Sequence, residues 1–326
     1  MFNFDIEDQN VAERMAYIDF KLRFTGSINR SDLHQMFGLA EASASKMMTK
    51  YSSYKKDNMS YNAKQRFNEI VRGNFSPLLN LSAETALGML ANGFNKNKLY
   101  QLPEIGFERA GLIEGSLNIE FVERITRAMS QGYAVECSYL SGSSDNLDKR
   151  TLLPLTLLFD GRNWIFRAFC REEDGIGRFK NFNFARVLSA TESLENKRLP
   201  HEELHQDKEW TMQVPLLLVP HGRLSEKEIE LVKRDYGMHE GKLIRTERAA
   251  MIWYLKELWC VDDRSELAYQ EELKEFNEKK DMLENDLKLD ELEREKQLKE
   301  LRNAYSKYHF RLTNVDMVTA VISSLR

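Results

Sequence analysis

Four cationic side chains stand among aromatic residues in a stretch of this chain made of residues 163–170 and 178–187. In chain order they are Arg167, Arg178, Lys180 and Arg186. The stretch alternates as half-buried strands do, and a folded sheet needs only the apolar half of that pattern. Arginine donates paired hydrogen bonds to phosphate and stacks on aromatic rings. The pattern therefore indicates a site for an anionic, nucleotide-like ligand.

Every second side chain of residues 164–171 shares a face of the expected strand. We expect one face to be core, with Trp164, Phe166, Ala168 and Cys170. The other is the candidate ligand face, with Ile165, Arg167, Phe169 and Arg171. The alternative is that Arg167 is an exposed cross-strand partner of Glu172 or Asp174.

Further strands are expected at residues 133–139, at 152–159 and from Arg178 onward, with a tight turn at Asp160-Gly161. Short strands and tight turns predict a small β-barrel or a strongly curled sheet. Ser141 and Ser143 are further hydroxyl donors, although an ordinary polar loop explains both at least as well. The candidate ligand-binding residues are Tyr139, Ser141, Arg150, Trp164, Arg167, Arg178, Phe179, Lys180 and Arg186.

The first 75 residues read as helix, helix, Gly-containing turn, helix and a β-hairpin, which is the order of a winged helix-turn-helix. The third helix, residues 41–54, buries Ala44, Met47, Met48 and Tyr51 in this reading. Its other face and the hairpin turn carry the candidate DNA-binding residues, which are Ser43, Ser45, Lys46, Thr49, Lys50, Lys64 and Arg66. The alternative is an ordinary solvated helix face.

The composition is that of a soluble globular protein, with 326 residues, 42% hydrophobic and 30% charged. No apolar run approaches the length of a membrane span. Three widely spaced cysteines form no metal or disulfide pattern and favour a reducing cytoplasm. The net charge of −4 averages unlike regions, because residues 41–72 hold seven Lys or Arg against three acids.

The C-terminal third reads as a strand at 212–219, a helix opened by a capping box at Ser225 and ended at Gly237, and a second helix at 246–259. A final strand and helix follow from Phe310. Between them, residues 263–307 are highly charged, with leucines that break heptad register. We expect a protruding helical hairpin or one long helix there. Two interpretations of this segment are open, namely a charged helix that is surrounded by solvent and a contact between two copies in a dimer.

Residues 201–205 spell H-E-x-x-H, the zinc-protease motif. In those enzymes the motif lies within a continuous helix, whereas here Pro200 precedes His201 directly. The alternative function is a metal-dependent hydrolase that uses His201, Glu202 and His205. We favour a polar linker, and we expect no metal, no cofactor and no catalysis.

Several segments, in order, carry a resemblance. In the central region they are Tyr139-x-Ser141, Arg150 with Pro154, Trp164-x-x-Arg167-Ala168-Phe169-Cys170, and Phe179-Lys180-x-Phe182 with Arg186-Val187. On either side stand residues 26–38, Ala42-Ser43, residues 58–61, His221-x-x-Leu224-Ser225 and residues 235–238. The chain resembles WYL-domain transcriptional regulators found beside bacterial phage-defence islands, the BrxR-like and CapW-like repressors. Ile165-Phe166 and Asn181 depart from the family pattern, which bears on the identity of the ligand.

The resemblance implies a cytoplasmic, homodimeric repressor of a phage-defence operon. It would bind a palindromic double-stranded DNA operator and be relieved by a nucleotide or nucleic-acid effector. An activator of the same architecture is the alternative. The implied fold class is α+β, with a winged helix-turn-helix at 1–75, a helical connector at 76–130, a barrel-like WYL ligand-sensing domain at 131–199, a linker at 200–211 and a C-terminal α/β extension at 212–326 that contains the charged insertion.

Overall fold

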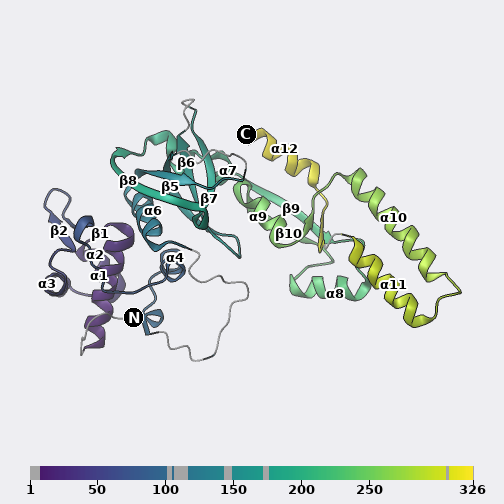
Figure 1. Cartoon of the computed structure of the whole chain (residues 1–326), viewed down its shortest axis with the longest axis horizontal. Coiled ribbons are helices and arrows are strands. Elements are labelled where there is room, and N and C mark those ends of the chain that lie inside the picture. The colour runs from purple at the N-terminus through teal and green to yellow at the C-terminus, as the bar shows by residue number, and fades with distance from the viewer. Residues whose placement is uncertain are drawn as a thin grey trace. The chain divides into compact units, whose positions relative to one another are not determined.

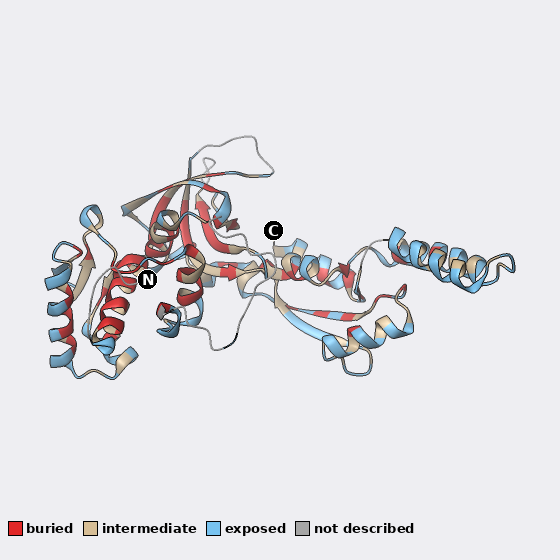
Figure 2. Cartoon of the chain, turned by 60° about the horizontal axis from the view of Figure 1, so that its bottom comes forward, coloured by how far each residue is buried: buried red, intermediate tan, exposed pale blue. Residues whose placement is uncertain are grey.

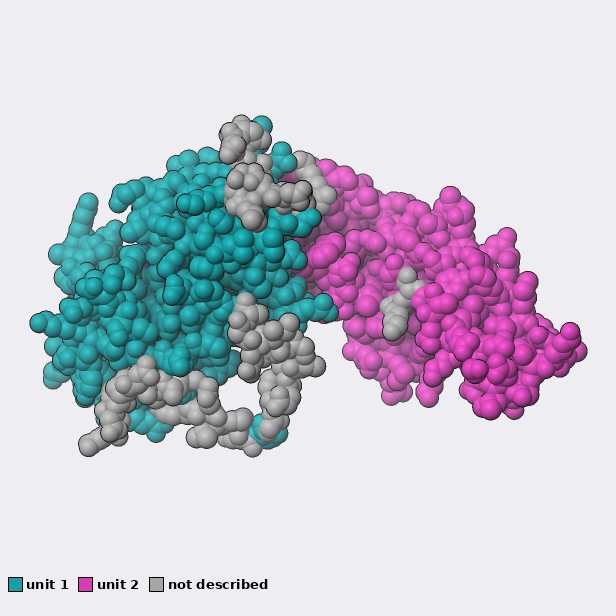
Figure 3. Space-filling view, in the orientation of Figure 1, with its two compact units in different colours: residues 1–204 teal, residues 205–326 magenta. Residues whose placement is uncertain are grey.

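The computed structural model describes residues 8–100, 105, 117–142, 149–171, 176–305 and 308–325. It divides into two compact units, residues 1–204 and 205–326 (Figure 3). Ser143, Glu172 and Asp174 lie outside the described residues. No helix among the described residues is long and apolar enough to cross a membrane.

The first unit opens with the predicted winged helix-turn-helix (Figure 1). Its elements are α1 (Gln9–Thr25), β1 (Ser27–Ile28), α2 (Arg30–Phe37), α3 (Glu41–Tyr54), β2 (Met59–Asn62) and β3 (Phe67–Ile70). The strands form an antiparallel sheet in the order β1-β3-β2. Gly26 and Gly38 end α1 and α2 in the left-handed conformation that glycine adopts without strain. The predicted bounds of α3 are confirmed.

A helical connector follows, as expected. After the single turn η1 (Arg72–Asn74), which belongs to the preceding winged-helix segment, the connector contains α4 (Ala83–Asn92), α5 (Asn97–Tyr100) and α6 (Ile119–Gln131). Asn118 caps α6 through its side-chain oxygen, and Gly132 ends it. Apolar residues of α1, α4 and α6 pack with one face of the following sheet in a single core cluster. The winged helix and the sheet are thus joined by shared hydrophobic packing.

The central sheet has five antiparallel strands in the order β7-β6-β5-β4-β8. They are β4 (Tyr133–Tyr139), β5 (Lys149–Phe159), β6 (Trp164–Arg171), β7 (Arg178–Asn183) and β8 (Val187–Lys197), with the short turn η2 (Phe184–Arg186) before β8. Four of these strands match the expectation. The structure adds β8 and shows no pairing between the edge strands β7 and β8 of the described chain, so closure into a barrel is not confirmed.

The turn between β5 and β6 is longer than the two residues expected from Asp160-Gly161. The backbone N–H of Asp160 donates to the carbonyl of Asn163, and the Asp160 carboxylate accepts from the N–H of Arg162 at 2.8 Å. Gly161 has φ 93°, a value that favours glycine. The hairpin is therefore confirmed, with residues 160–163 as its loop.

The second unit is an α/β module. It begins with α7 (Lys208–Thr211) and contains a four-stranded sheet in the order β10-β9-β12-β11. The strands are β9 (Gln213–Pro220), β10 (Leu243–Arg248), β11 (Val261–Asp262) and β12 (Phe310–Leu312), and the helices α8 (Glu226–Asp235), α9 (Ile252–Leu258) and α12 (Val315–Leu325) pack with one face of it. The predicted capping box at Ser225 is present.

One prediction for this unit was wrong. The helix expected over 246–259 starts only at α9, after the turn η5 (Ala249–Met251). The residues before it belong to β10, where Thr246 pairs with Pro215 and Arg248 with Gln213. Pairing with β9 therefore outweighs the local helical preference of that segment.

The charged segment forms a helical hairpin, one of the two expected forms. Its helices are α10 (Glu266–Glu284) and α11 (Glu291–Ala304), which lie side by side and project from the sheet (Figures 1 and 2). Their surfaces are mainly exposed (Figure 2). We call this hairpin the arm.

Candidate nucleic-acid interface and sensor sheet

The exposed face of α3 carries the candidate DNA-binding residues. Its opposite face buries Ala44, Met47, Met48 and Tyr51, as predicted. Ser43, Lys46, Thr49 and Lys50 are exposed, and Ser45 is half-buried. A helix held by one apolar face and presenting short polar and cationic side chains on the other can enter a major groove.

Tyr51 fixes α3 to the rest of the winged helix. Its hydroxyl donates to the carboxylate of Asp19 at 2.8 Å, and the backbone N–H of Leu78 donates to the same carboxylate at 3.0 Å. Asp19 is fully buried, and burial raises its pKa to about 6. The orientation of α3 thus depends on one buried carboxyl group of α1.

The wing presents Lys64 and Arg66 at the tip of the β2–β3 hairpin. Both side chains are exposed. The Asn62 side chain accepts from the backbone N–H groups of Lys64 and Gln65, each at 3.1 Å, and so shapes the turn. Arg66 has φ 60°, which turns the chain back into β3. The wing therefore has a defined conformation with its two cations directed outward.

These cations have no ion-pair partner among the described residues. That holds for Lys46, Lys50, Lys64 and Arg66, whereas Arg30 nearby is paired with Glu41 at 2.7 Å. Unpaired cations on one face are available to neutralise phosphates. A cavity of about 560 Å³ opens between the helix-turn-helix and Arg66. It is lined further by Asn29, Arg30, Ser31, His34, Leu39, Ala40 and Glu41, which sequence analysis did not assign to a site.

The structure confirms the predicted core face of β6. Phe166, Ala168 and Cys170 lie in the core cluster and Trp164 packs against it. On the opposite face a small cluster contains Phe169 with Phe179 against it, their rings 5.0 Å apart. Both faces of β6 are therefore buried, which explains its nearly continuous apolar character.

The strand register places three of the four cations on two different faces of the sheet. Lys180 pairs with Ala168 and Arg178 with Cys170, so both side chains belong to the face of the main core. Arg167 pairs with Asn181 on the other face. It is 2% exposed and donates to the Asn181 side-chain oxygen at 3.0 Å. The structure therefore does not gather the cations of β6 and β7 on one face.

Arg150 and Tyr139 accompany Arg178 and Lys180 on the core face. Arg150 lies opposite Cys137, and its guanidinium is 5.8 Å from the centre of the Tyr139 ring. The Tyr139 hydroxyl accepts from the backbone N–H of Asn183 at 2.9 Å. Arg186 is exposed, and its carbonyl accepts from the N–H of Leu140, next to Ser141. Strands β4, β5 and β7 thus each bring a cation or hydroxyl group to this side.

The H-E-x-x-H motif does not form the helix that zinc proteases use. It falls in two separate turns, η3 (Pro200–Glu202) and η4 (Leu204–Gln206). Glu202 is buried and ion-paired with Arg171 at 2.5 Å, whereas the His201 side chain is exposed. Among the described residues no group of three metal-ligating side chains is close enough to hold a metal. Glu202 is therefore a structural anchor.

A polar cluster between the winged helix and the sheet was not predicted. Glu192 of β8 accepts from Arg127 of α6 at 2.8 Å and from Arg72 at 3.3 Å. The Tyr133 hydroxyl donates to the same carboxylate. The cluster also contacts α1, because the Arg127 side chain donates to the backbone carbonyl of Arg23 at 2.7 Å. No local motif marks these residues, because they come from four distant segments.

Comparison with known proteins gives the class first. Three family models match in succession: the winged helix-turn-helix domain of BrxR transcriptional regulators over residues 10–90, the WYL domain over 120–192, and the C-terminal dimerization domain of BrxR over 213–279. The chain is thus built as a WYL-domain transcriptional regulator of the BrxR type, and the predicted winged helix and WYL domains are confirmed.

Curated relatives narrow this further. The DNA-binding transcriptional repressor CapW of Stenotrophomonas maltophilia is 31% identical over 250 residues, covering 74% of this chain and 80% of the relative. The CapW repressors of Escherichia coli and Pseudomonas aeruginosa are 28% and 25% identical, covering 80% and 91% of those proteins. The chain belongs to the CapW family of DNA-binding transcriptional repressors. These names confirm the expectation that it is not an enzyme.

Proposed function

We propose that this protein is a homodimeric transcriptional repressor that binds a roughly palindromic operator through α3 and the wing. The observation that carries the proposal is the set of unpaired cations, Lys46, Lys50, Lys64 and Arg66, on the exposed side of a winged helix. Repression, rather than activation, follows the names of the curated relatives.

The proposed dimer sets the shape of the operator. Two identical winged helix-turn-helix domains related by a twofold axis require two inverted half-sites in the DNA. Each α3 would contact base edges with Ser43, Ser45 and Thr49, while its lysines contact phosphates. A match to a dimerization domain over residues 213–279 supports the pairing of two chains.

The proposed effector is a nucleotide or a nucleic-acid fragment bound at the central sheet. Arg150, Arg178 and Lys180 support an anion on the core face, near the Tyr139 ring. Arg167 with Asn181 marks a second candidate position on the opposite face. We propose that binding there relieves repression, and that the controlled genes form a phage-defence operon, as in the family the sequence resembles.

A mobility-shift titration with the DNA upstream of the protein's own gene tests the proposal. We expect a specific complex at physiological salt that a scrambled duplex of equal length does not compete away. Nuclease footprinting should then show two protected half-sites in inverted orientation. Folded, dimeric protein that binds both duplexes equally would contradict the proposal.

The effector is tested on the preformed complex. Short single-stranded oligonucleotides and mononucleotides are added in turn, and release of the operator is recorded. If the core face binds the effector, Lys180→Ala should weaken release, whereas Asn181→Ala on the other face should not. The reverse result would move the site to Arg167. Failure of every such probe to release the operator from wild-type protein would contradict this class of effector.

A further inference from the structure

The sheet of the second unit leaves one face exposed at β9 and β10. Val214, Leu216 and Leu218 of β9 point into the core, and the residues between them point away. We call the opposite side the outer face, formed by Pro215, Leu217, Val219, Ile244 and Thr246. Ile244 and Leu217 are directly opposite each other and are 68% and 38% exposed. These residues form an uncharged patch on the unit's surface.

A second apolar surface lies at the far end of the arm. The arm tip, residues 281–292, joins α10 to α11 and exposes three large apolar side chains. Met282 is 72% exposed, Leu287 97% and Leu292 79%. Burying such side chains is favourable, so three at one tip mark a contact surface.

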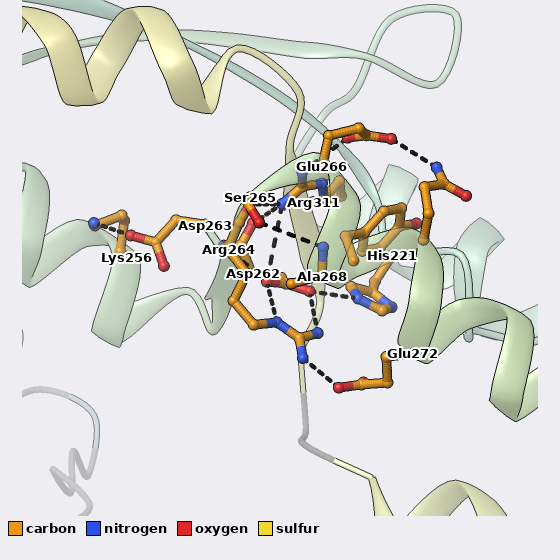
Figure 4. A network of polar contacts seen from close by, with 12 residues as sticks. His221, Lys256, Asp262, Asp263, Arg264, Ser265, Glu266, Ala268, Glu272 and Arg311 are labelled. Carbon is orange, nitrogen blue, oxygen red and sulfur yellow. Dashed lines mark hydrogen bonds and ion pairs between the residues drawn. The ribbon is translucent and has the colours of Figure 1, made fainter.

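A polar network anchors the base of the arm (Figure 4). The buried carboxylate of Asp262 accepts from Arg264 at 2.6 Å and lies 3.1 Å from the His221 ring nitrogen. Although burial alone would raise the pKa of Asp262, these hydrogen bonds hold it well below its usual range. Arg311 of β12 pairs with Glu266 of α10 at 2.9 Å. The first turn of α10 is thereby fixed to the end of the sheet.

The two helices stiffen each other along the arm. The Phe276 ring packs edge-on against Tyr305 at 5.3 Å, which ties α10 to the end of α11. A helix of 19 residues is about 28 Å long at 1.5 Å per residue. The arm projects away from the sheet in both views (Figures 1 and 2). The tip therefore lies at the end of the arm that is remote from the sheet.

The charges of the two surfaces are complementary. Residues 281–292 contain five acidic side chains and one lysine, a net charge of −4. Residues 233–248, which include β10, contain five Lys or Arg against three acids, a net charge of +2. Lys242 is exposed and directly precedes β10, two residues before Ile244, so it stands at the margin of the outer face. A basic margin beside an apolar patch fits an acidic, apolar tip.

We propose that two copies of this chain exchange arms, each arm tip docking on the outer face of the other copy. This rests on the homodimer of the proposed function and names the surfaces that build it. The matched dimerization domain, residues 213–279, contains the whole outer face and most of α10. Two equivalent contacts, related by the twofold axis, would cover both apolar surfaces in each copy and pair their opposite charges.

Engineered disulfides test the contact directly. Cys137 and Cys170 are buried, so a Cys260→Ser background leaves no exposed thiol among the native cysteines. Leu287→Cys and Ile244→Cys proteins are made separately in this background, mixed and oxidised. We expect a covalent dimer of the two variants, visible on a non-reducing gel. The matched control replaces Leu287→Cys by Lys274→Cys, an exposed position midway along α10, and should give none.

Each of the other outcomes contradicts a defined part of the two proposals. Cross-linking of Leu287→Cys alone would show that tips meet tips, and cross-linking of Ile244→Cys alone that faces meet faces. Light scattering on the unmodified chain separates the two proposals. A monomer would contradict the homodimer and the arm exchange together. A dimer that gives no mixed cross-link would contradict only the arm exchange.

Discussion

Arg72 donates to the carboxylate of Glu192 across the junction between the winged helix and the central sheet, at 3.3 Å. Arg72 stands two residues after the wing strand β3, and Glu192 lies within β8. Arg127 donates to the same carboxylate through two nitrogens, at 3.0 and 2.8 Å. One carboxylate thus connects the segment that follows the wing to the central sheet.

Replacement of Glu192 tests this junction. Glu192→Gln removes the charge but keeps the shape, leaving Arg72 and Arg127 without their shared anion. Breaking a buried ion pair in this way costs about 3 kcal/mol. We expect a loss of that order in the free energy of unfolding, measured by urea denaturation.

The matched control lies on the same strand. Glu195 is exposed, so Glu195→Gln removes an equal charge without breaking the junction. It should leave the unfolding free energy within about 0.5 kcal/mol of the wild type. Equal stability of the Glu192→Gln protein and this control would show that the junction contributes nothing.

The raised pKa of Asp19 predicts that the free energy of unfolding depends on pH. Burial raises its pKa in the folded protein from 3.8 to about 6, so the folded state binds this proton more tightly than the unfolded state. Its contribution is fully present below about pH 4 and is lost as the pH rises through 6. Relative to Asp19→Asn, the wild type should lose about 3 kcal/mol of stability between pH 4 and 7.

Unfolding free energies of both proteins at several pH values measure this difference. Asp57→Asn, at an exposed position of the same domain, controls for removal of one carboxylate. A difference between wild type and Asp19→Asn that stays constant with pH would contradict the raised pKa.

Substitutions in the H-E-x-x-H segment should affect the stability of the protein differently for the glutamate and for the two histidines. Glu202→Gln should destabilise the protein, because the buried carboxylate holds Arg171 and accepts from the Leu199 N–H at 2.7 Å. The double variant His201→Ala/His205→Ala should leave stability and operator binding unchanged. Metal analysis should find no stoichiometric zinc in the wild type. Zinc that is lost in the double variant would revive the hydrolase hypothesis.

Elements with a strong local pattern were predictable from the sequence. The helix α3 was predicted with its correct bounds, because its apolar residues repeat at helical spacing. The strand β8 was missed, because Glu192, Glu195 and Lys197 obscure its alternation. Residues 246–248 look helical beside Ala249 and Ala250, yet pairing with β9 makes them a strand. In these places tertiary contacts outweigh local preference.

The candidate sites were predictable to different degrees. Exposure of Lys46 and Lys50 follows from helical periodicity alone. The division of Arg167 from Lys180 depends on the register between β6 and β7, which a period of two within each strand does not specify. The Glu192 cluster was out of reach, because its members meet only after the winged helix and the sheet have packed together.

The salt dependence of operator binding tests the central claim most directly. Fluorescence anisotropy gives the affinity of the wild type, of Lys46→Ala/Lys50→Ala and of the control Lys274→Ala/Lys280→Ala, whose lysines lie on the arm. Each phosphate contact contributes about 0.9 to the slope of log affinity against log salt concentration. We predict that the α3 double variant binds more weakly and loses up to about 1.8 from that slope, while the control matches the wild type. An unchanged affinity and slope in the α3 variant would contradict the assignment of α3 as the DNA-binding element.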